Sequence, residues 1–295
     1  MRILIIRPGA VGDALLALPV IQALRTHYTN PRIIFVGNAA VLPLMLASGL
    51  VEEVSDYEDT RWSALFSVEA QFIASNLIAP SSVDLAICWL RDPDGIVERN
   101  LRAACVLQVI VAPGRPPEGK RVHIVDYLAQ TVGMSRDDGQ IFTINAGGYG
   151  ENLPIIYDLA VHPGSGGARK CWPASSFAAV IQRLCERERH VLLLGGPADH
   201  ERIDAIRRAL TCAPAILLAA PLLEVARALR QCRSYLGNDS GVTHLAAMLG
   251  VPTIALFSAS DPAVWHPMGP SVEVLYAPRW EQMTIDRVLA RVICS

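Results

Sequence analysis

The chain of 295 residues has few charged side chains and almost no lysine. Charged residues make up only 18% of it, against 52% hydrophobic residues, so we expect a folded rather than a disordered protein. The net charge of −2 lacks the basic excess typical of DNA- and RNA-binding proteins, and we expect no nucleic-acid partner. Lysine is found only at Lys120 and Lys170 among the 26 basic residues, so each lysine needs an explanation.

Long apolar runs and clustered cysteines are also missing. No run of 18 apolar residues occurs, so we predict no membrane span. The apolar run Ile3–Ile6 near the start is short, because Pro8 and Gly9 follow it closely. We interpret it as a first strand rather than as part of a secretory signal. The seven cysteines are odd in number and widely spaced, without a C-x-x-C pair. We therefore expect reduced thiols, no metal site, and a cytoplasmic protein for which peripheral contact with the inner membrane stays open.

Short apolar runs alternate with helix-compatible segments from end to end, which predicts an α/β fold. Such continuous runs are typical of buried parallel strands. The expected strands are Ile3–Ile6, Ile33–Val36, Glu53–Tyr57, Leu85–Leu90, Val106–Val111, Tyr157–Val161, Val191–Leu194, Ala215–Leu218, Ser234–Leu236, Thr253–Phe257 and Val272–Tyr276. Helices fit at 14–26, 39–48, 62–78, 95–104, 123–132, 174–187, 200–210, 222–232, 241–249 and 283–293.

A polar, glycine-rich stretch separates two such halves. We place a linker at about 135–154, with one further short strand at Ile141–Ile144. It joins an N-terminal domain, 1–145, to a C-terminal domain, 155–295, and the last helix could pack back on the first domain. Both halves are expected to be doubly wound, Rossmann-like α/β domains that face each other across a cleft, because ligands bind beyond the carboxyl ends of parallel strands.

The segment Gly237–Gly250, with the sequence GNDSGVTHLAAMLG, is expected to join a strand to a helix. Ser240 or Asp239 can cap that helix, and Gly241 lets a ligand approach the backbone. A helix N-terminus of this kind favours an anion, most often a phosphate, and His244 faces the same side one turn later. Taken alone, the segment is as consistent with an ordinary capped turn as with an anion site.

A second turn of the same kind begins at His162 and has the sequence HPGSGGARKCWP. It follows the expected strand Tyr157–Val161, and its serine and glycines, Ser165 and Gly166 among them, form a loop rich in backbone donors that suits phosphate oxygens. Lys170 adds a mobile cation at the end of this loop. A solvated loop lysine is the alternative interpretation.

A third loop, Arg7–Asp13, follows the first strand. Its glycines, Gly9 and Gly12, have the spacing G-x-x-G rather than the G-x-G-x-x-G of dinucleotide-binding loops, which argues against a nicotinamide-dependent dehydrogenase. Asp13 is equally well explained as an acid in the first turn of a helix and as a general base that accepts a proton from a hydroxyl nucleophile.

Together these motifs resemble the ADP-heptose heptosyltransferase family, glycosyltransferase family 9. The resemblance rests on G-D after the first strand, H-P-G-S-x-x-x-x-K-x-W-P in the middle of the chain and D-S-G-x-x-H-L-A-A near its end, and it spans nearly the whole sequence. It implies the GT-B architecture of two Rossmann-like domains. It also implies an inverting, metal-independent transfer of a heptose from ADP-heptose to a hydroxyl acceptor. ADP-heptose, or a related nucleotide sugar, would be the donor substrate, and no cofactor is expected.

The resemblance also implies roles for individual residues. Asp13, next to Gly12, would be the catalytic base, and Lys170 would stabilise the leaving diphosphate. The donor would be bound at Gly12, Ser165, Gly166, Lys170, Asp239, Ser240, Gly241 and His244. Glu201 would bind the nucleotide ribose, although Asp199 competes with it for that role.

The acceptor is the least defined part of this prediction. Family members that act on the lipopolysaccharide core resemble one another in having basic clusters in the N-terminal domain. The corresponding regions of this chain hold only scattered arginines: Arg61, and further on Arg91, Arg99 and Arg102. Of these, Arg61 and Arg91 are the candidate acceptor-binding residues. Residues 1–150 hold 12 basic against 15 acidic side chains. A lipopolysaccharide core sugar, another surface glycan and a small molecule therefore all stay open as acceptors, and we expect a monomer. The alternatives are a GT-B enzyme that uses another nucleotide sugar and a non-catalytic nucleotide-binding protein of the same fold.

Overall fold

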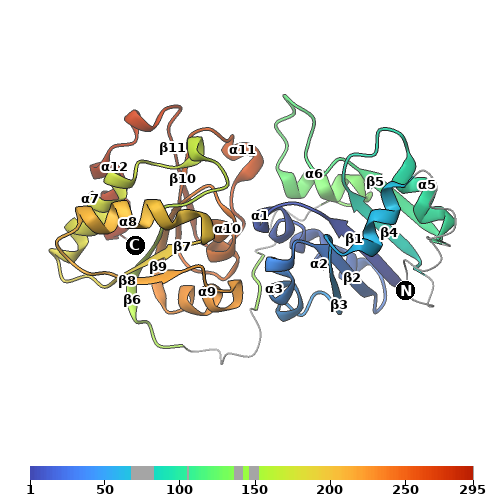
Figure 1. The fold of residues 1–295 in the computed structure, drawn as a ribbon, viewed down its shortest axis with the longest axis horizontal. Helices are drawn as coiled ribbons and strands as arrows, with labels where there is room; N and C mark the ends of the chain where they lie inside the picture. Colours follow the sequence, from blue (N-terminus) through green and yellow to red (C-terminus); the bar gives the residue numbers. More distant parts are fainter. Residues whose placement is uncertain (68–82, 105, 136–141, 146–152, 295) are drawn as a thin grey trace. The chain divides into compact units, whose positions relative to one another are not determined.

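The computed structural model describes residues 1–67, 83–104, 106–135, 142–145 and 153–294 of the chain. The chain divides into two compact units, Met1–Gln140 and Ile141–Ser295. Each unit is built on one parallel sheet flanked by helices (Figure 1). The expected α/β architecture with two doubly wound sheets is therefore confirmed.

The first unit has a five-stranded sheet with β1 in its middle. Its elements are β1 (Arg2–Arg7), α1 (Val11–Leu15), α2 (Leu18–His27), β2 (Arg32–Gly37), η1 (Ala39–Val41), α3 (Leu42–Ala47), β3 (Glu53–Asp56), η2 (Thr60–Phe66), β4 (Leu85–Trp89), α5 (Ile96–Ala103), β5 (Gln108–Ala112) and α6 (Ile124–Thr131). The strand order is β3-β2-β1-β4-β5, and Ile3 of β1 pairs with Ile33 of β2 and Leu85 of β4. On one face, α5 and η2 pack against Leu4 and Ile6. The residues of β1 that point to the other face are buried as well, so this strand is buried on both sides.

The second unit has a six-stranded sheet with the order β11-β10-β9-β6-β7-β8. Its elements are β6 (Tyr157–His162), η4 (Ala168–Lys170), α7 (Ala174–Cys185), β7 (Val191–Gly195), η5 (Pro197–Asp199), α8 (His200–Ala209), β8 (Ala215–Leu218), α9 (Leu222–Leu229), β9 (Cys232–Asn238), α10 (Gly241–Met248), β10 (Thr253–Phe257), α11 (Pro262–Trp265), β11 (Val272–Tyr276), η6 (Trp280–Gln282) and α12 (Ile285–Cys294). Val161 and Leu236 belong to the core beneath α7, α8 and α12. On the opposite side of β9, Tyr235 hydrogen-bonds Thr243 of α10 at 2.9 Å.

The helix expected at 14–26 is two helices. α1 ends at Leu15 and α2 begins at Leu18, because Pro19 has no N–H group to donate to the carbonyl of Leu15. The helix expected at 62–78 begins as η2, and from residue 68 onward it lies outside the described residues.

One expectation about the end of the first half is wrong. Within the expected strand Ile141–Ile144, the described residues 142–144 are irregular, because Ile144 N donates to the carbonyl of Met248 at 2.9 Å instead of to a strand. The apolar residues of the last helix, α12, including Val288 and Val292, join the core of the second unit beside α7.

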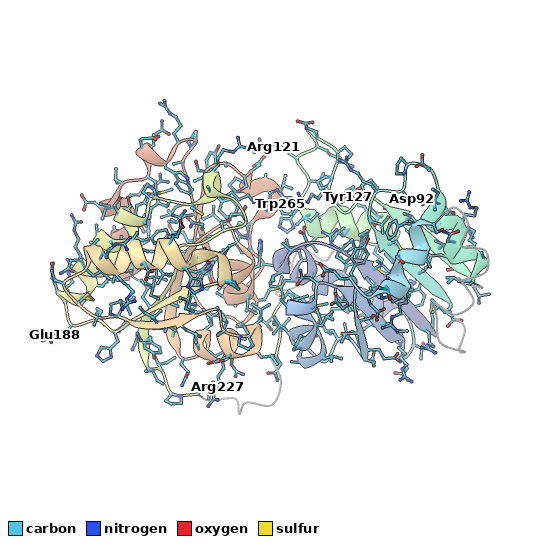
Figure 2. All side chains as sticks on the ribbon, viewed as in Figure 1. Asp92, Arg121, Tyr127, Glu188, Arg227 and Trp265 are labelled. Carbon is cyan, nitrogen blue, oxygen red and sulfur yellow. A yellow bond between two sulfur atoms is a disulfide. The ribbon has the colours of Figure 1, made fainter. Side chains whose placement is uncertain are left out.

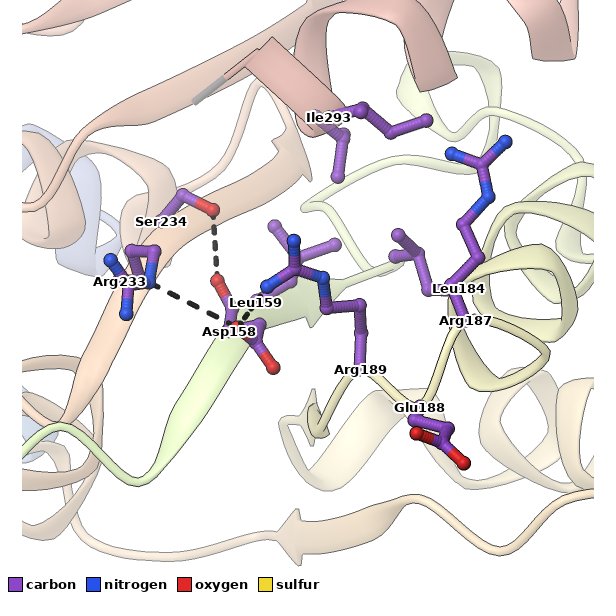
Figure 3. Close-up of a pocket in the computed structure, with 10 residues that line it drawn as sticks. Asp158, Leu159, Leu184, Arg187, Glu188, Arg189, Arg233, Ser234 and Ile293 are labelled. Atoms are coloured by element: carbon purple, nitrogen blue, oxygen red, sulfur yellow. Dashed lines mark hydrogen bonds and ion pairs between the residues drawn. The ribbon is translucent and has the colours of Figure 1, made fainter.

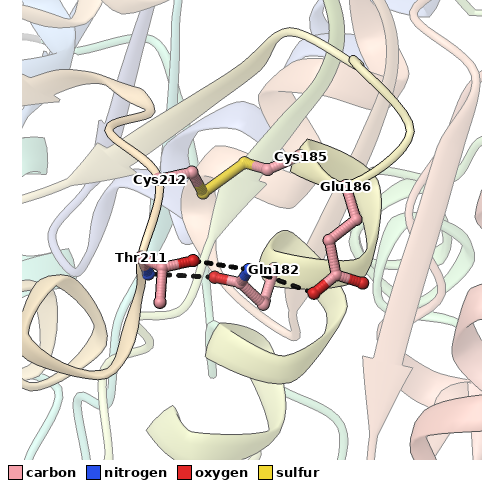
Figure 4. Close-up of a disulfide and its surroundings, with 5 residues drawn as sticks. All are labelled: Gln182, Cys185, Glu186, Thr211 and Cys212. Atoms are coloured by element: carbon pink, nitrogen blue, oxygen red, sulfur yellow. Dashed lines mark hydrogen bonds between the residues drawn. A yellow bond between two sulfur atoms is a disulfide. The ribbon is translucent and has the colours of Figure 1, made fainter.

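Cys185 and Cys212 form a disulfide, which contradicts the expectation that all cysteines are reduced thiols (Figure 4). The two residues are 27 positions apart and meet because α7 packs against α8, so that the turn after α8 reaches the end of α7. The same turn is held by Gln182, whose side-chain oxygen accepts a hydrogen bond from Thr211 N at 3.0 Å. The described free cysteines, all buried, are Cys88, Cys171 and Cys232.

No helix within the described part of the chain is both long enough and apolar enough to cross a bilayer.

Candidate functional site

Two turns of the second unit meet at the point where the strand order reverses. β6 and β9 are neighbours, with His162 paired to Gly237, but the chain continues from β6 toward β7 and from β9 toward β10 on the other side. The backbone therefore diverges beyond the carboxyl ends of β6 and β9, which is where doubly wound sheets bind ligands. The turns after these two strands carry the motifs that the sequence singles out.

Asn238 holds the two turns together. This last residue of β9 is fully buried, its side-chain oxygen accepts from Trp172 N at 2.9 Å, and its side-chain nitrogen donates to the carbonyl of Pro163 at 2.7 Å. Because both ends of the amide are used, an aspartate in its place would leave a buried carbonyl without a donor. Asn238 lies within the segment Gly237–Gly250, but the sequence assigned it no role, since its signal there is only a polar residue at the end of an apolar strand.

Ser165 and Lys170 both reach across to Asp239. The Ser165 hydroxyl donates to the backbone carbonyl of Asp239 at 2.6 Å, and Lys170 Nζ lies 2.6 Å from Asp239 Oδ2. The Lys170 side chain stays 39% exposed, so its ammonium group can also meet a ligand from outside. The two motifs therefore form one site, and Lys170 is not simply a solvated loop lysine.

The Asp239 carboxylate is a buried charge with three partners. Besides Lys170, Ser260 Oγ donates to Asp239 Oδ2 at 2.6 Å, and His244 Nε2 lies 3.8 Å from Oδ1. Burial on its own would raise the pKa of Asp239, but the His244 imidazole and the Lys170 ammonium outweigh it and lower the pKa to about 2. The carboxylate is therefore ionised at neutral pH, and it fixes Lys170 at the mouth of the site. His244 Nδ1 is buried and has no hydrogen-bond partner in the described structure.

Ser240 begins α10 and belongs to a buried polar chain. Its Oγ accepts from Thr243 N at 3.4 Å and lies 3.2 Å from His162 Nδ1, while His162 Nε2 lies 3.3 Å from Asp199 Oδ2. Asp199, His162 and Ser240 thus tie together the ends of β7, β6 and β9. Gly164 leaves room for this chain, since a Cβ there would lie 2.2 Å from Asp199 Oδ1.

The remaining predicted donor residues of the second unit differ in their availability to a ligand. Burial would raise the pKa of Asp199, but hydrogen bonds from His162 and the backbone lower it, so this carboxylate is engaged inside the protein. Glu201, in the first turn of α8, is exposed and has no partner among the described side chains. Of the two acidic residues expected to compete for a ribose, Glu201 is therefore exposed to solvent, whereas Asp199 is engaged. Gly166 is exposed with nothing packed over it, and Gly241 is the first residue of α10.

Asp13 lies in the first unit, in the short helix α1 that follows β1. Its Oδ2 accepts from Ala10 N at 3.0 Å, so the carboxylate does close the start of the helix. Two arginines approach it as well: Arg7 Nη2 lies 3.6 Å from Oδ1 and Arg115 Nη2 lies 3.4 Å from Oδ2. Gly12 precedes Asp13 in the same helix. Asp13 is only 8% exposed. Its interpretation as an acid in the first turn of a helix is compatible with its interpretation as a general base.

The two arginines predicted at the acceptor side differ in their surroundings. Arg61, in η2, pairs with Asp59 at 3.1 Å and donates to Ser55 Oγ at 2.7 Å, so it is committed to local partners. Arg91 follows β4, is exposed and has no partner within the described part of the chain. Because β4 pairs with β1, Arg91 and Asp13 follow neighbouring strands at the same edge of the sheet.

The first unit contains one D-x-D sequence, Asp92-Pro93-Asp94, a pattern that can hold a divalent cation with a nucleotide sugar. Here Asp92 caps α5, because its oxygens accept from Val97 N at 3.1 Å and from Glu98 N at 3.0 Å (Figure 2). Among the described residues there is no group of three or more histidine, cysteine or acidic side chains that could hold a metal ion.

A hollow of about 370 Å³ lies at the opposite edge of the second sheet (Figure 3). Its lining includes Asp158, near the start of β6, and Arg233, near the start of β9. Asp158 pairs with Arg189 at 3.0 Å and with Arg233 at 3.9 Å. The positive charges of two arginines that line the hollow are therefore already balanced by a carboxylate. Since ligands bind beyond the other ends of such strands, the converging turns are the better candidate site.

Comparison with known proteins places the two motifs of the second unit in a family. Residues 136–290 match the model of glycosyltransferase family 9 (heptosyltransferase). Lipopolysaccharide heptosyltransferase 3 of Escherichia coli is 29% identical over 140 residues, and the match covers 46% of this chain and 40% of that protein. The chain thus spans about two fifths of the length of this curated relative. Lipooligosaccharide heptosyltransferase 2 of Haemophilus influenzae is 24% identical over 93% of this chain and 88% of its own length.

Two solved structures share the whole fold. The glycosyl transferase family 9 protein from Veillonella parvula has a TM-score of 0.79 at 18% identity, over 100% of this chain and 97% of that one. The ADP-heptose LPS heptosyltransferase II of Escherichia coli has a TM-score of 0.76 at 20% identity, over 100% of this chain and 98% of that one. At these identities the likeness concerns the fold, which is the GT-B arrangement expected from the sequence.

Proposed function

Because the chain belongs to glycosyltransferase family 9, we propose that it transfers a heptose from ADP-heptose to a hydroxyl group of an acceptor. One observation carries this proposal. Ser165 bonds the backbone carbonyl of Asp239 and Lys170 bonds its buried carboxylate, next to Ser240 at the start of α10, at the switch point of the second sheet and within the residues that match the family model. This arrangement suits a diphosphate beside a helix N-terminus.

The donor side of the proposal assigns a task to each group. The Lys170 ammonium, held by Asp239, and the first N–H groups of α10 would meet the diphosphate oxygens. Asp239 itself would repel a phosphate, so its task is to hold Lys170. Glu201, exposed at the start of α8, would accept hydrogen bonds from the ribose hydroxyls.

The transfer itself is a single displacement in this proposal. The acceptor oxygen forms a bond to the anomeric carbon while the bond from that carbon to the β-phosphate oxygen breaks, and the electron pair leaves with ADP. The acceptor hydroxyl proton moves to Asp13, and attack opposite the leaving group inverts the anomeric configuration. Lys170 and the backbone donors offset the negative charge that grows on the diphosphate, so the step needs no metal ion.

Two other functions would produce different results in binding and transfer measurements. A GT-B enzyme for another nucleotide sugar would bind a different base, and a non-catalytic protein would bind a nucleotide without turnover. A thermal-shift panel of ADP, UDP, GDP and CDP separates the first case, because a ligand at 100 times its Kd stabilises the folded state by about 2.7 kcal/mol. We expect ADP to give the largest shift. If another nucleotide gives a larger shift, the proposed donor ADP-heptose is wrong and the donor carries that other nucleotide.

Transfer is then measured with ADP-heptose against a panel of acceptors. The panel contains a lipopolysaccharide core acceptor, other surface glycans and small hydroxylated molecules, since Arg61 and Arg91 alone do not define the acceptor. ADP release that depends on one of these acceptors supports the proposal. Binding of ADP without any transfer or donor hydrolysis would favour a non-catalytic nucleotide-binding protein.

A further inference from the structure

Arg7 is a buried cation at the carboxyl end of β1, and it is only 2% exposed. Its Nε donates to the backbone carbonyl of Asp13 at 3.1 Å, and its Nη1 donates to the carbonyl of Gly114 at 2.7 Å. The remaining nitrogen, Nη2, lies 3.6 Å from Asp13 Oδ1 and has no hydrogen-bond partner in the described structure. The guanidinium group is thus fixed at two corners, and its third corner is directed at the carboxylate of Asp13.

The two oxygens of Asp13 have different surroundings. Oδ2 accepts from Ala10 N at 3.0 Å and faces Arg115 Nη2 at 3.4 Å. Among the described residues, the one polar partner near Oδ1 is Arg7 Nη2, at a distance beyond a normal hydrogen bond. Oδ1 therefore keeps the lone pairs that a proton would use, while Oδ2 is held by the helix start.

Two glycines make this close arrangement possible. A Cβ at Gly114 would lie 2.2 Å from Arg7 Nη1, and a Cβ at Gly9 would lie 2.8 Å from Asp13 Oδ2. Gly9 also has φ +137°, a conformation that other residues rarely adopt. The backbone on both sides is thus shaped around the Arg7–Asp13 pair.

The two arginines near Asp13 differ in exposure, and this difference decides their strength. The Arg7 side chain is 2% exposed, whereas the Arg115 side chain is 67% exposed. A charge in contact with water is screened and contributes little, while a buried one acts at low dielectric. Arg7 is thus the dominant positive charge on Asp13.

The other groups that face Arg7 do not cancel its charge. Burial lowers the pKa of Arg7 to about 10, opposed by the charge of Asp13, so the guanidinium stays protonated at neutral pH. Tyr127, from α6, also interacts with Arg7, and burial raises its pKa, so it is neutral there (Figure 2). The Trp89 ring lies 5.9 Å from the guanidinium carbon and adds no charge.

We propose that Arg7 is a positioning residue for the proposed transfer, one that fixes the carboxylate of Asp13 and presents its Oδ1 to the acceptor hydroxyl. The proton transfer to Asp13 rests on the proposed function, whereas the contact between Arg7 and Asp13 does not. Oδ1 takes the proton, Oδ2 stays bonded to Ala10 N, and Arg7 does not touch the substrates because Nη2 is enclosed by the protein.

The test compares Arg7→Met with Arg115→Met, which removes an exposed arginine from the same carboxylate. For each variant, kcat and kcat/KM for heptose transfer are measured from pH 4 to pH 9. We expect the acid limb of kcat/KM to move upward by about one pH unit or more in Arg7→Met, because an adjacent arginine typically stabilises an ionised aspartate by that much. In Arg115→Met the limb moves by less than about 0.3 pH units, since an exposed ion pair is weak. KM for ADP-heptose stays unchanged in both variants.

Arg7→Lys keeps the charge but loses the two-corner fixation. We expect it to restore the acid limb while kcat stays about tenfold below the original, since a misplaced base is costly. This variant also serves if Arg7→Met does not fold. An unmoved limb in folded Arg7→Met, an equal shift in both Met variants, or a displaced limb in Arg7→Lys would overturn the proposal.

A direct measurement separates this inference from the proposed function. Carboxyl ¹³C NMR of aspartate-labelled protein, with Asp13→Asn for assignment, follows protonation of Asp13 without any substrate. We expect Asp13 to protonate at higher pH in Arg7→Met than in the original protein and in Arg115→Met. If Asp13 protonates at higher pH in Arg7→Met but the protein transfers no heptose, the Arg7–Asp13 pair is retained and the proposed function is rejected. If protonation of Asp13 is unchanged in Arg7→Met but transfer is intact, the proposed function is retained and the role of Arg7 is rejected.

Discussion

A single buried carboxylate organises the candidate donor site. Asp239 receives Lys170 and Ser260 on one oxygen and His244 on the other, and its backbone carbonyl receives Ser165. A buried charge is costly unless it is paired and hydrogen-bonded, so the contacts from Lys170, Ser260 and His244 offset the cost of burying the carboxylate. The same contacts bring two sequence motifs 69 residues apart to one place, as the Lys170–Asp239 contact shows.

Lys170→Ala tests the proposed contact with the diphosphate. Loss of a charge-assisted hydrogen bond of about 1.5 kcal/mol should weaken ADP binding by about tenfold, measured by calorimetric titration. The other lysine of the chain, Lys120, lies in the first unit and provides a matched control as Lys120→Ala. Equal ADP affinity in the two variants would remove Lys170 from the donor site.

The lowered pKa of Asp239 predicts a loss of stability in acid. Its folded-state pKa of about 2 lies below the ordinary value of 3.8, so its contribution is present above pH 4 and is lost as the pH falls toward 2. Between pH 6 and pH 3 the difference in unfolding free energy between the original protein and Asp239→Asn should shrink by about 1 kcal/mol, measured by urea unfolding. Asp286→Asn, at a side chain that is 84% exposed, should show no such change. A constant difference across this pH range would contradict the assignment.

Residue types at strand ends could be predicted from the sequence, but their partners could not. Ser165, Lys170, Asp239 and Ser240 stand in turns marked by glycine and capping residues, and the structure brings them together. The role of Asn238 depends on carbonyl and amide groups about 70 positions away, which only the pairing of β6 with β9 brings into reach. No local pattern contains that information.

At the scale of elements, apolar runs identified the strands because buried parallel strands are apolar on both faces. Helix limits were less accurate. Pro19 divides one expected helix into α1 and α2, and this break places Asp13 in a separate short helix of five residues. The region 142–144 has the composition of a strand, but Ile144 hydrogen-bonds the end of α10, so no ladder forms.

The link between α7 and the turn after α8 predicts a measurable stabilisation. The Cys185–Cys212 disulfide closes a loop of 27 residues, which should add about 3.5 kcal/mol to the unfolding free energy by restricting the unfolded chain. Cys185→Ser/Cys212→Ser, compared with the original protein in urea with and without reductant, measures this value. The double variant should not respond to the reductant. If the reductant also leaves the original protein unchanged, the disulfide does not contribute.

At the scale of the whole molecule, the two units divide the proposed chemistry between them. The second unit carries the residues proposed to hold the donor, and the first carries Asp13 with its arginines. The doubly wound form of both units followed from the sequence, because strand–helix alternation continues through both halves. The acceptor could not be predicted in this way, because Arg61 is engaged by Asp59 and Ser55, while Arg91 is exposed and has no partner in the described part.

This division is tested most directly by Asp13→Asn, assayed for acceptor-dependent ADP release from ADP-heptose and for ADP binding in the same preparation. The account predicts that kcat falls by about 10²- to 10⁴-fold, the usual contribution of a general base, while the Kd for ADP changes by less than about twofold. Turnover close to that of the original protein would contradict the role of Asp13. A loss of ADP binding parallel to the loss of turnover would contradict the separation of donor binding from proton removal.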